Sequence, residues 1–547
     1  MKNRRNGVFM QAGILAVAGI ICRIIGLLYG SPLTGIIGDE GNGYYSQAYN
    51  CYTIILLISS YSIPSAISKV IAQKLGVGEY RNAQRIFHCA LIYVIIVGGA
   101  ASLFLFFGAG LLVEGNSVPV LKVFAPTIFF FGLLGVLRGY FQAHKTMVQT
   151  SISQILEQLC NAVVSLSGAY LLMQSVNGQS QTTKAIYGAI GSAIGTGSGV
   201  VTALLFMWFM YHINRKTVLK RAERDTHPED SYRTIFKTII LIVTPFIMST
   251  FIYNFTTMLD QTIYTKILIY GKGFLEKDVL TSYGIFSRKA VVISNIPIAL
   301  ATAMSAAMMP SIASSYAQGQ KKETAQLVNK VVRMTMMIAI PSAVGLIALA
   351  KPVMMMLFPQ RASLDQAAFL LAGMGITVIF YSLSTVTNAV LQGIGRVNAP
   401  VVNAALSLCI QAALLCVLLF TTDIGSFGLV VATIVYSLLM CMFNQMSVNR
   451  NLEVNQDVRK TYLMPLLASA VMGIAAWVAY QGAHFVFMMA MGDGYFANFL
   501  AAAVALCIAA FVYAAVLIRT KGVTEEELRG FPKGSKIVTL VKRIHLL

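Results

Sequence analysis

Two basic residues, Arg288 and Lys289, lie inside a long apolar stretch that covers residues 283–319. A charged side chain at the bilayer centre costs about 2.5–3.5 kcal/mol on insertion scales, so such residues usually face a bundle interior or a water-filled cavity. Pro297 and Pro310 interrupt the same stretch, and backbone groups freed by proline must be satisfied by neighbours inside a membrane. A cationic, kinked membrane helix favours a path for an anionic substrate.

Two further cations, Arg23 and Lys69, lie in other apolar stretches. Arg23 and Arg288 are each about 10 Å from the outer end of their predicted helices, at 1.5 Å per residue. Guanidinium groups at one level predict a cationic patch facing a central cavity, and the planar guanidinium suits phosphate oxygens. We therefore predict substrate binding by Arg23, Arg288, Lys289 and Lys69. The alternatives are that each arginine pairs with a nearby acid and that Lys69 extends to the interface.

Only two acids, Glu157 and Asp260, lie within the apolar stretches. Glu157 is either a proton or cation site, or the ion-pair partner of Lys69 or Arg138. Asp260 stands among Asn254, Thr256, Thr257, Gln261 and Thr262. A carboxylate with neutral oxygens is a ligand set that a hard cation such as Na⁺ prefers, so Asp260 is a possible sodium ligand. The alternative is that Asp260 neutralises Arg288.

The elements that position these residues are predicted membrane helices. The chain has 547 residues, of which 57% are hydrophobic and 11% charged, and its mean hydropathy is +0.71. This composition is typical of a polytopic membrane protein. A spanning helix needs about 20 mostly apolar residues. Fourteen stretches qualify: 8–30, 43–72, 86–113, 118–142, 148–174, 185–212, 236–266, 279–312, 327–350, 366–392, 399–422, 424–448, 462–490 and 496–518.

The basic residues predict the orientation of these spans. With the N-terminus inside, the inner connections and both termini carry thirty of the 41 Lys and Arg residues, and the outer connections carry seven. This split follows the positive-inside rule, so we expect a plasma-membrane protein with both termini in the cytoplasm. The same distribution accounts for the net charge of +20 without a nucleic-acid partner.

A weak internal repeat divides the spans into two halves. The second span ends in Ile63-Pro64-Ser65 and the eighth in Met309-Pro310-Ser311, and each is followed by a similar polar loop. Six spans separate the repeats, which predicts two halves of equal orientation, as in alternating-access carriers. The expected fold is all-α, with two pseudo-symmetric six-helix bundles around a central cavity and two extra C-terminal helices. The predicted domains are 1–222, 223–450, 451–519 and a cytosolic tail at 520–547.

The motifs of common catalytic sites are missing from the sequence. It contains no HExxH, Walker A or GxSxG motif, which gives no support to hydrolase or ATPase chemistry. The eight cysteines all lie in apolar segments without a CxxC pair, so neither a disulfide framework nor a zinc site is predicted. We expect a carrier without a cofactor, not an enzyme, coupled to Na⁺ or H⁺ if it is coupled to an ion. We also expect a monomer.

Three segments resemble a known family of carriers. Cys22-Arg23-Ile24-Ile25-Gly26 is similar to a span-one motif of MurJ-type lipid II flippases, Ser287-Arg288 stands where that group has an Asp-Arg pair, and Gly393-Ile394-Gly395-Arg396 resembles its loop before span eleven. The whole chain resembles the multidrug/oligosaccharidyl-lipid/polysaccharide exporter superfamily. Within it, the chain is similar to the polysaccharide biosynthesis branch that includes the stage V sporulation protein B group.

The resemblance implies export of an undecaprenyl-pyrophosphate-linked saccharide to the outer leaflet of a bacterial plasma membrane, with Arg23 and Arg288 holding the pyrophosphate. Some lipid II flippases also have an acid comparable to Asp260, for which the resemblance implies a sodium site. Tyr29 and Gly30 depart from the charged pair of those flippases, so lipid II and related cell-wall precursors are both open. The competing interpretations are a multidrug cation antiporter of the same fold and, less favoured, a membrane glycosyltransferase. Such an antiporter needs an acidic cavity, and such an enzyme needs catalytic carboxylates.

Overall fold

The computed structural model describes residues 2–61, 63–144, 146–454, 456–520 and 522–523. All regular secondary structure in these ranges is helical, as the sequence predicts. The chain divides into two compact units, Met1–Gly284 and Ile285–Leu547, which we call unit 1 and unit 2. Most of the predicted tail at 520–547 lies outside the described residues.

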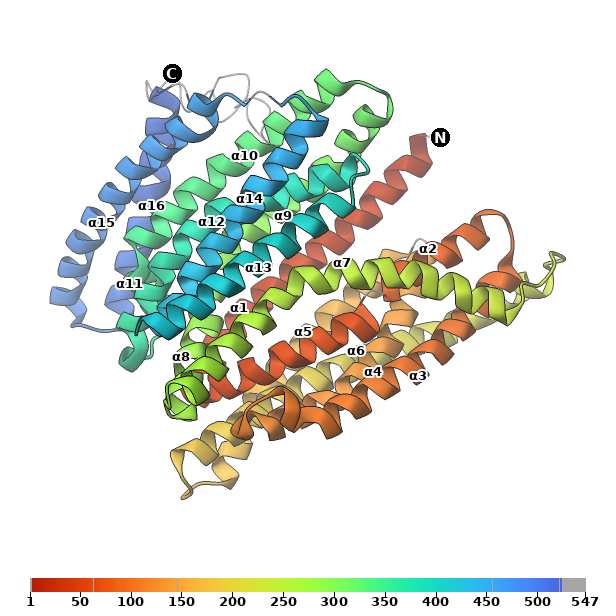
Figure 1. Cartoon of the computed structure of the whole chain (residues 1–547), viewed down its shortest axis with the longest axis horizontal. Coiled ribbons are helices and arrows are strands. Elements are labelled where there is room, and N and C mark those ends of the chain that lie inside the picture. The colour runs from red at the N-terminus through yellow and green to blue at the C-terminus, as the bar shows by residue number, and fades with distance from the viewer. Residues whose placement is uncertain (1, 62, 145, 455, 521, 524–547) are drawn as a thin grey trace. The chain divides into compact units, whose positions relative to one another are not determined.

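Unit 1 is built from eight α-helices among the described residues (Figure 1). The last of them ends one residue beyond the unit boundary. Their bounds are α1 (Lys2–Leu56), α2 (Ile63–Gly76), α3 (Tyr80–Leu112), α4 (Val118–Ala143), α5 (Met147–Ser175), α6 (Gln181–Glu223), α7 (Tyr232–Lys266) and α8 (Glu276–Ile285).

Helix α4 is the central element of unit 1. It packs against α2, α3 and α6, and most of its side chains are buried. Leu134 of α4 belongs to one cluster of buried apolar side chains with Ile67 of α2, Phe87 of α3 and Met207 of α6. An apolar helix surrounded by other helices is typical of a bundle core, so α4 fixes the positions of residues on its neighbours.

Helix α1 contains two of the predicted spans, 8–30 and part of 43–72. The helix is broken at Gly38, where the backbone has φ 69° and ψ 178°. A positive φ is readily adopted only by glycine, so Gly38 supplies the turn that the sequence predicts between the spans. The second span continues through a π-helix, Leu57–Tyr61, into α2.

Unit 2 begins with a π-helix at Phe286–Ala290, which leads from α8 into the first α-helix of the unit. The α-helices of the unit are α9 (Val291–Ala317), α10 (Lys321–Ala348), α11 (Ala350–Leu357), α12 (Leu364–Gly393), α13 (Asn398–Thr421), α14 (Phe427–Asn451), α15 (Met464–Met491) and α16 (Tyr495–Arg519).

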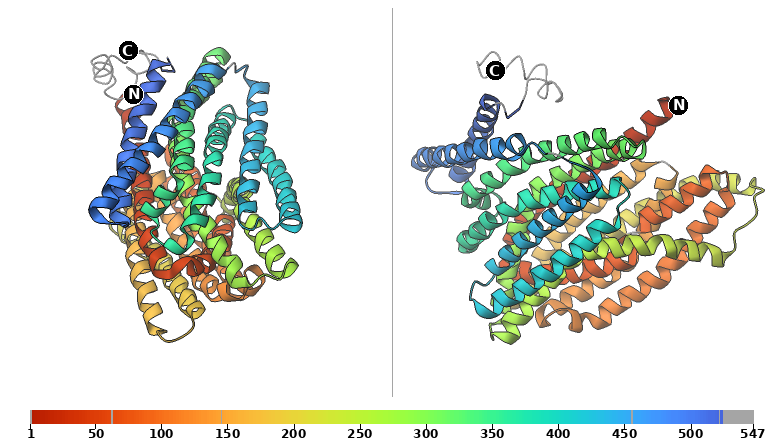
Figure 2. Two further views of the ribbon diagram at one scale, coloured as in Figure 1. Left: turned by 90° about the vertical axis from the view of Figure 1, so that its left-hand side faces the viewer. Right: turned by 45° about the horizontal axis from the view of Figure 1, so that its top comes forward.

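Helix α12 has the same central place in unit 2 as α4 has in unit 1. It packs against α9, α10 and α14, and its buried side chains include Val378, Val386 and Leu391. Helices α4 and α12 correspond to the fourth and tenth predicted spans, which are six spans apart, as are the two segments of the sequence repeat. Helices α15 and α16 lie side by side, and α15 also packs on α10 (Figures 1 and 2).

Twelve helical stretches among the described residues are long and apolar enough to cross a membrane. One of them, Val17–Ser60, is 44 residues long and includes the break at Gly38. Helix α7, which covers a further predicted span, is not among the twelve, and the side chains of residues 242–250 are not described. The structure therefore confirms a polytopic, all-helical membrane protein, while the number fourteen stays a prediction.

Two features of the helices were not predicted from the sequence. Helix α11 is a short additional helix between α10 and α12. The boundary between the compact units falls after Gly284, so α7 and most of α8 belong with unit 1. The predicted halves 1–222 and 223–450, with 451–519 apart, are defined by sequence repetition and stay a prediction.

Candidate substrate and cation sites

The pair Arg288 and Lys289 lies in the π-helix at the start of unit 2. Such single π-turns are rare and occur frequently at functional sites, because the wider turn redirects side chains. Arg288 is half-buried. Lys289 is 1% exposed, and its Nζ donates a hydrogen bond of 2.8 Å to Ser363 Oγ. In this structure the ammonium of Lys289 therefore has a partner within unit 2.

Arg23 on α1 and Lys69 on α2 are both exposed. Neither side chain makes a hydrogen bond or an ion pair with another described residue. Both charges are therefore open to a ligand. Arg23 belongs to unit 1 and Arg288 to unit 2, so their predicted convergence on one cavity stays a prediction.

Glu157 on α5 has an ion-pair partner on α4. Arg138 Nη2 donates to Glu157 Oε2 at 2.7 Å, and Arg138 Nε donates to Ser153 Oγ at 2.9 Å. The side chains of Arg138 and Glu157 are 8% and 17% exposed. Of the partners that the sequence left open for Glu157, the structure thus selects Arg138. A carboxylate that is already neutralised in this way is a weaker candidate for a cation site.

Asp260 is buried near the C-terminal end of α7, with 8% of its surface exposed. The polar residues around it in the sequence divide into three groups. Asn254 and Thr257 are exposed. Gln261 and Thr262 are bonded elsewhere, with Thr262 Oγ1 donating to the carbonyl of Met258 at 2.8 Å.

The third group is Thr256, one helical turn before Asp260. Its side chain is buried and its Oγ1 makes no hydrogen bond to a described residue. Positions i and i+4 share one face of a helix. A buried carboxylate beside a buried hydroxyl without a partner fits a hard cation, but it supplies fewer ligands than the six-residue set that the sequence suggested.

A polar network that the sequence did not predict joins α1, α7 and α8. Asn50 Nδ2 donates to Gln261 Oε1 and to the hydroxyl of Tyr283, each at 2.7 Å. Gln261 Nε2 donates to the carbonyl of Gln47 at 3.3 Å. The available signal was the density of polar residues in Gly41–Asn50, an otherwise membrane-spanning stretch. This network fixes α7, and with it Asp260, against the second span.

A cluster of charged residues anchors the α6–α7 connection to the turn between α2 and α3. Asp225 accepts hydrogen bonds from the backbone N–H groups of Arg81 at 2.8 Å and His227 at 3.0 Å. These bonds, Arg81 first, lower the pKa of Asp225 to about 2, and the nearby imidazole of His227 acts in the same direction. Lys74 Nζ also lies 2.6 Å from carboxylate oxygens of Glu79 and Asp230. The connection is therefore held by several charge-assisted bonds.

Histidine, cysteine and carboxylate side chains do not cluster in the described ranges: they form no group of three that could hold a metal ion. The eight cysteines are free thiols. These findings do not bear on a sodium ion, which the proposed Asp260 site would bind with one carboxylate and neutral oxygens.

Sequence comparisons relate the chain to flippases. A family model described as lipid II flippase MurJ matches residues 84–501. The lipid II flippase MurJ of Bacillus subtilis (strain 168) is 25% identical, over 92% of this chain and 93% of that protein. Stage V sporulation protein B of the same organism is 22% identical, over 95% of this chain and 96% of that protein.

Two solved structures share the fold. A lipid II flippase MurJ in an inward closed conformation matches with a TM-score of 0.65 and 15% identity, over 92% of this chain and 99% of that chain. An inward-facing multidrug resistance transporter of the MATE family, in the MOP superfamily, matches with a TM-score of 0.64 and 17% identity. The match covers 78% of this chain and 95% of that chain. At these identities the likeness establishes the fold alone.

Proposed function

The chain belongs to the lipid II flippase MurJ family, and we propose that it exports an undecaprenyl-pyrophosphate-linked saccharide, lipid II or a related cell-wall precursor, across the plasma membrane. The protein would act by alternating access, as a carrier and not as an enzyme. The proposed ligands of the pyrophosphate are Arg23 and Arg288, with Lys69 as a further contact. Lys289 would have to leave Ser363 before it could contribute.

The observation that carries this proposal is the state of the intramembrane charges. Arg23 and Lys69 lie exposed in unit 1 without an acidic partner among the described residues, whereas the acid Glu157 is neutralised by Arg138. Charges in membrane segments are costly and are retained for function. Available cations favour an anionic substrate such as a pyrophosphate, which arginine binds with two parallel hydrogen bonds.

The membrane topology proposed with this function has fourteen spans and both termini in the cytoplasm. Helix α1 would supply two spans because of the break at Gly38, and α7 would supply one. Labelling single cysteines in a cysteine-free protein tests the orientation. A cysteine at Gln179 should react from outside, and one at Val77 only from inside. Reaction of both from the same side would contradict this topology.

Coupling to Na⁺ through Asp260 is part of the proposal. Asp260 and Thr256 would hold the ion, whose positive charge would stabilise the buried carboxylate. Asp260→Asn should then abolish any sodium dependence of transport while binding of the pyrophosphate is retained. Transport that is indifferent to sodium in the unaltered protein would exclude this coupling, and tighter pyrophosphate binding by Asp260→Asn would indicate that Asp260 is instead a counter-ion of Arg288.

The second candidate function is export of cationic drugs, which the fold shared with a MATE-family transporter favours. A cationic substrate would need available acids, and Glu157 is paired with Arg138 in this structure. The two functions are separated by expressing the protein in bacteria depleted of their own lipid II flippase. Restored growth supports the proposed function. Failure to restore growth at normal membrane abundance, together with increased drug resistance, would support the antiporter.

A further inference from the structure

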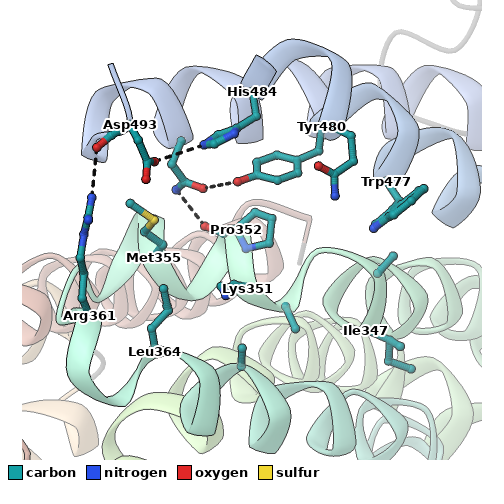
Figure 3. Close-up of a pocket in the computed structure, with 15 residues that line it drawn as sticks. Ile347, Lys351, Pro352, Met355, Arg361, Leu364, Trp477, Tyr480, His484 and Asp493 are labelled. Atoms are coloured by element: carbon teal, nitrogen blue, oxygen red, sulfur yellow. Dashed lines mark hydrogen bonds and ion pairs between the residues drawn. The ribbon is translucent and has the colours of Figure 1, made fainter. Parts of the chain in front are cut away.

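Unit 2 contains a cavity of about 600 Å³ that none of the proposed transport residues lines. It lies between α15 and α16 on one side and the segment from the end of α10 to the start of α12 on the other (Figure 3). Figure 3 shows two different ends. Arg361, His484 and Asp493 lie together at one end, and Trp477 and Ile347 lie at the other.

The wall of the cavity is held in place by buried hydrogen bonds. Asn498 on α16 is fully buried. Its Oδ1 accepts a bond of 2.8 Å from the hydroxyl of Tyr480, and its Nδ2 donates to the carbonyl of Pro352 at 3.2 Å. These bonds join α16, α15 and α11 across the cavity. A site that is formed before its ligand arrives loses less entropy on binding.

At the polar end of the cavity, Arg361 supplies a guanidinium that makes no ion pair with a carboxylate of the described residues. Arg361 Nη2 donates to the backbone carbonyl of Asp493 at 3.2 Å. Lys351 pairs with Asp365 at 2.6 Å, but the side chain of that acid is 84% exposed to solvent. His484 Nε2 lies 3.9 Å from the Asp493 carboxylate. Two cations, Lys351 and Arg361, and one acid, Asp493, line the cavity, and Asp365 outside the cavity balances the charge of Lys351.

The other end opens beside a surface that favours hydrocarbon. Trp477 lines the cavity and is 52% exposed, and Ile474, one helical turn earlier on α15, is 68% exposed. Exposed apolar side chains on a membrane-spanning helix contact lipid chains. An occupant of this cavity must therefore combine an anionic head with an apolar chain.

We propose that this cavity binds the headgroup of an anionic phospholipid, of the phosphatidylglycerol type, with an acyl chain against Trp477. Arg361, whose guanidinium has no carboxylate partner among the described residues, binds the phosphodiester, which carries the single negative charge of that lipid. The amide of Gln481, which also lines the cavity, can bond the headgroup hydroxyls. The volume is in the range of small-ligand pockets. Because none of the proposed transport residues lines the cavity, a bound lipid would be a structural or regulatory ligand and not the exported substrate.

The two tryptophans of the chain provide a selective test. Trp477 lines the cavity, whereas Trp208 lies on α6 in unit 1. In the full-length protein with Trp208→Phe, fluorescence reports only on Trp477, and quenching by phospholipids with brominated acyl chains measures their occupancy. We expect brominated phosphatidylglycerol to quench Trp477 at about tenfold lower concentration than brominated phosphatidylcholine, the effect of one charge-assisted hydrogen bond. Protein with Trp477→Phe, which retains only Trp208, should not distinguish the two lipids.

Variants of the cavity complete the experiment. Arg361→Gln should remove the preference for phosphatidylglycerol, Arg361→Lys should retain part of it, and Lys184→Gln, an outer-loop control in unit 1, should leave it unchanged. Equal quenching of Trp477 by both lipids, or an unchanged preference in Arg361→Gln, would overturn the proposal. Displacement of phosphatidylglycerol by lower concentrations of undecaprenyl pyrophosphate would assign the cavity to the carrier lipid instead. None of these outcomes depends on transport activity.

Discussion

At the scale of single residues, Arg288 is less deeply buried than the lysine beside it. It is half-buried in a π-turn, while its neighbour Lys289 is fully buried against Ser363. The sequence predicted both residues in one site, because a sequence pattern does not distinguish the environments of two adjacent charged residues in an apolar stretch. Which of them is fully buried depends on the local helix geometry, and a hydropathy pattern does not reveal a π-turn.

Replacing Arg288 by alanine should weaken binding of an undecaprenyl pyrophosphate ligand. Loss of one charge-assisted, largely desolvated contact costs about 1.5–3 kcal/mol, or roughly ten- to a hundred-fold in Kd. Arg288→Lys should fail in part, since an ammonium cannot reproduce the planar fork of the guanidinium. Titration of the purified protein measures the effect. Arg459→Ala is a matched control, because Arg459 also lies in a π-helix of unit 2 but outside the proposed site. Equal affinity of Arg288→Ala and the unaltered protein would remove Arg288 from the site.

A second prediction concerns the contribution of the Arg138–Glu157 ion pair to stability. Removing one partner of a buried pair leaves an uncompensated charge and costs about 3–5 kcal/mol, so Glu157→Ala should lower the thermal stability of the purified protein strongly. The double variant with Arg138→Ala should recover part of the loss. Glu323→Ala, at an exposed position on α10, should change stability by no more than about 0.5 kcal/mol. If Glu157→Ala is as stable as the unaltered protein but transport loses its ion dependence, Glu157 is a coupling residue. The structural role assigned to it here would then be contradicted.

At the scale of elements, the second span and α8 approach each other closely. A Cβ atom on Gly43 would collide with the backbone carbonyl of Leu280, whereas a Cβ on Gly26 of the same helix would have no neighbour within 4 Å. We therefore expect opposite effects of the same substitution. Gly26→Ala should raise stability by about 0.5–1 kcal/mol through helix propensity. Gly43→Ala should lower it by about 1–3 kcal/mol through overpacking. Thermal unfolding compares them, and equal stabilities would contradict the close approach of the two helices.

The α6–α7 connection should respond to pH through Asp225. Its pKa is lowered to about 2, so its contribution to the anchor is complete above the ordinary carboxyl pKa of about 4 and is lost as pH falls through about 2. A spin label on a cysteine at Thr226 should thus keep the same mobility from pH 8 to about pH 4 and become more mobile below. Asp225→Asn should raise the mobility throughout, and a label at Gln179 serves as the control. A rise in mobility already between pH 8 and about pH 5 would contradict the assignment of the pH dependence to Asp225.

Element positions were largely predictable because hydropathy decides them. The predicted span 399–422 corresponds to α13 (Asn398–Thr421), and 496–518 corresponds to α16 (Tyr495–Arg519). The π-turns at residues 57–61 and 286–290 were not predictable, since hydropathy does not distinguish a π-turn from a regular helical turn. The bonds of Asn50 to Gln261 and Tyr283 were missed because they join residues more than two hundred positions apart.

At the scale of the whole molecule, two kinds of division emerge. The sequence repeat separates two sets of six spans, and α4 and α12 are indeed the central helices of their units. Packing instead separates the chain after Gly284 and keeps α7 with unit 1. The network at Asn50 and the anchor at Asp225 hold the two ends of α7 to that unit. A sequence repeat shows only that two segments are similar. It does not predict which neighbouring helices each segment contacts.

The most direct test of the central claim is transport of a lipid-linked pyrophosphate saccharide by the purified protein in proteoliposomes. The measurement is the appearance of the saccharide on the opposite leaflet, detected with a membrane-impermeant enzyme that modifies it. We predict transport by the unaltered protein and by Arg459→Ala, and a reduction of about ten-fold or more for Arg23→Ala and Arg288→Ala. Absence of transport by the unaltered protein, or full transport by both arginine variants at equal incorporation, would contradict the account.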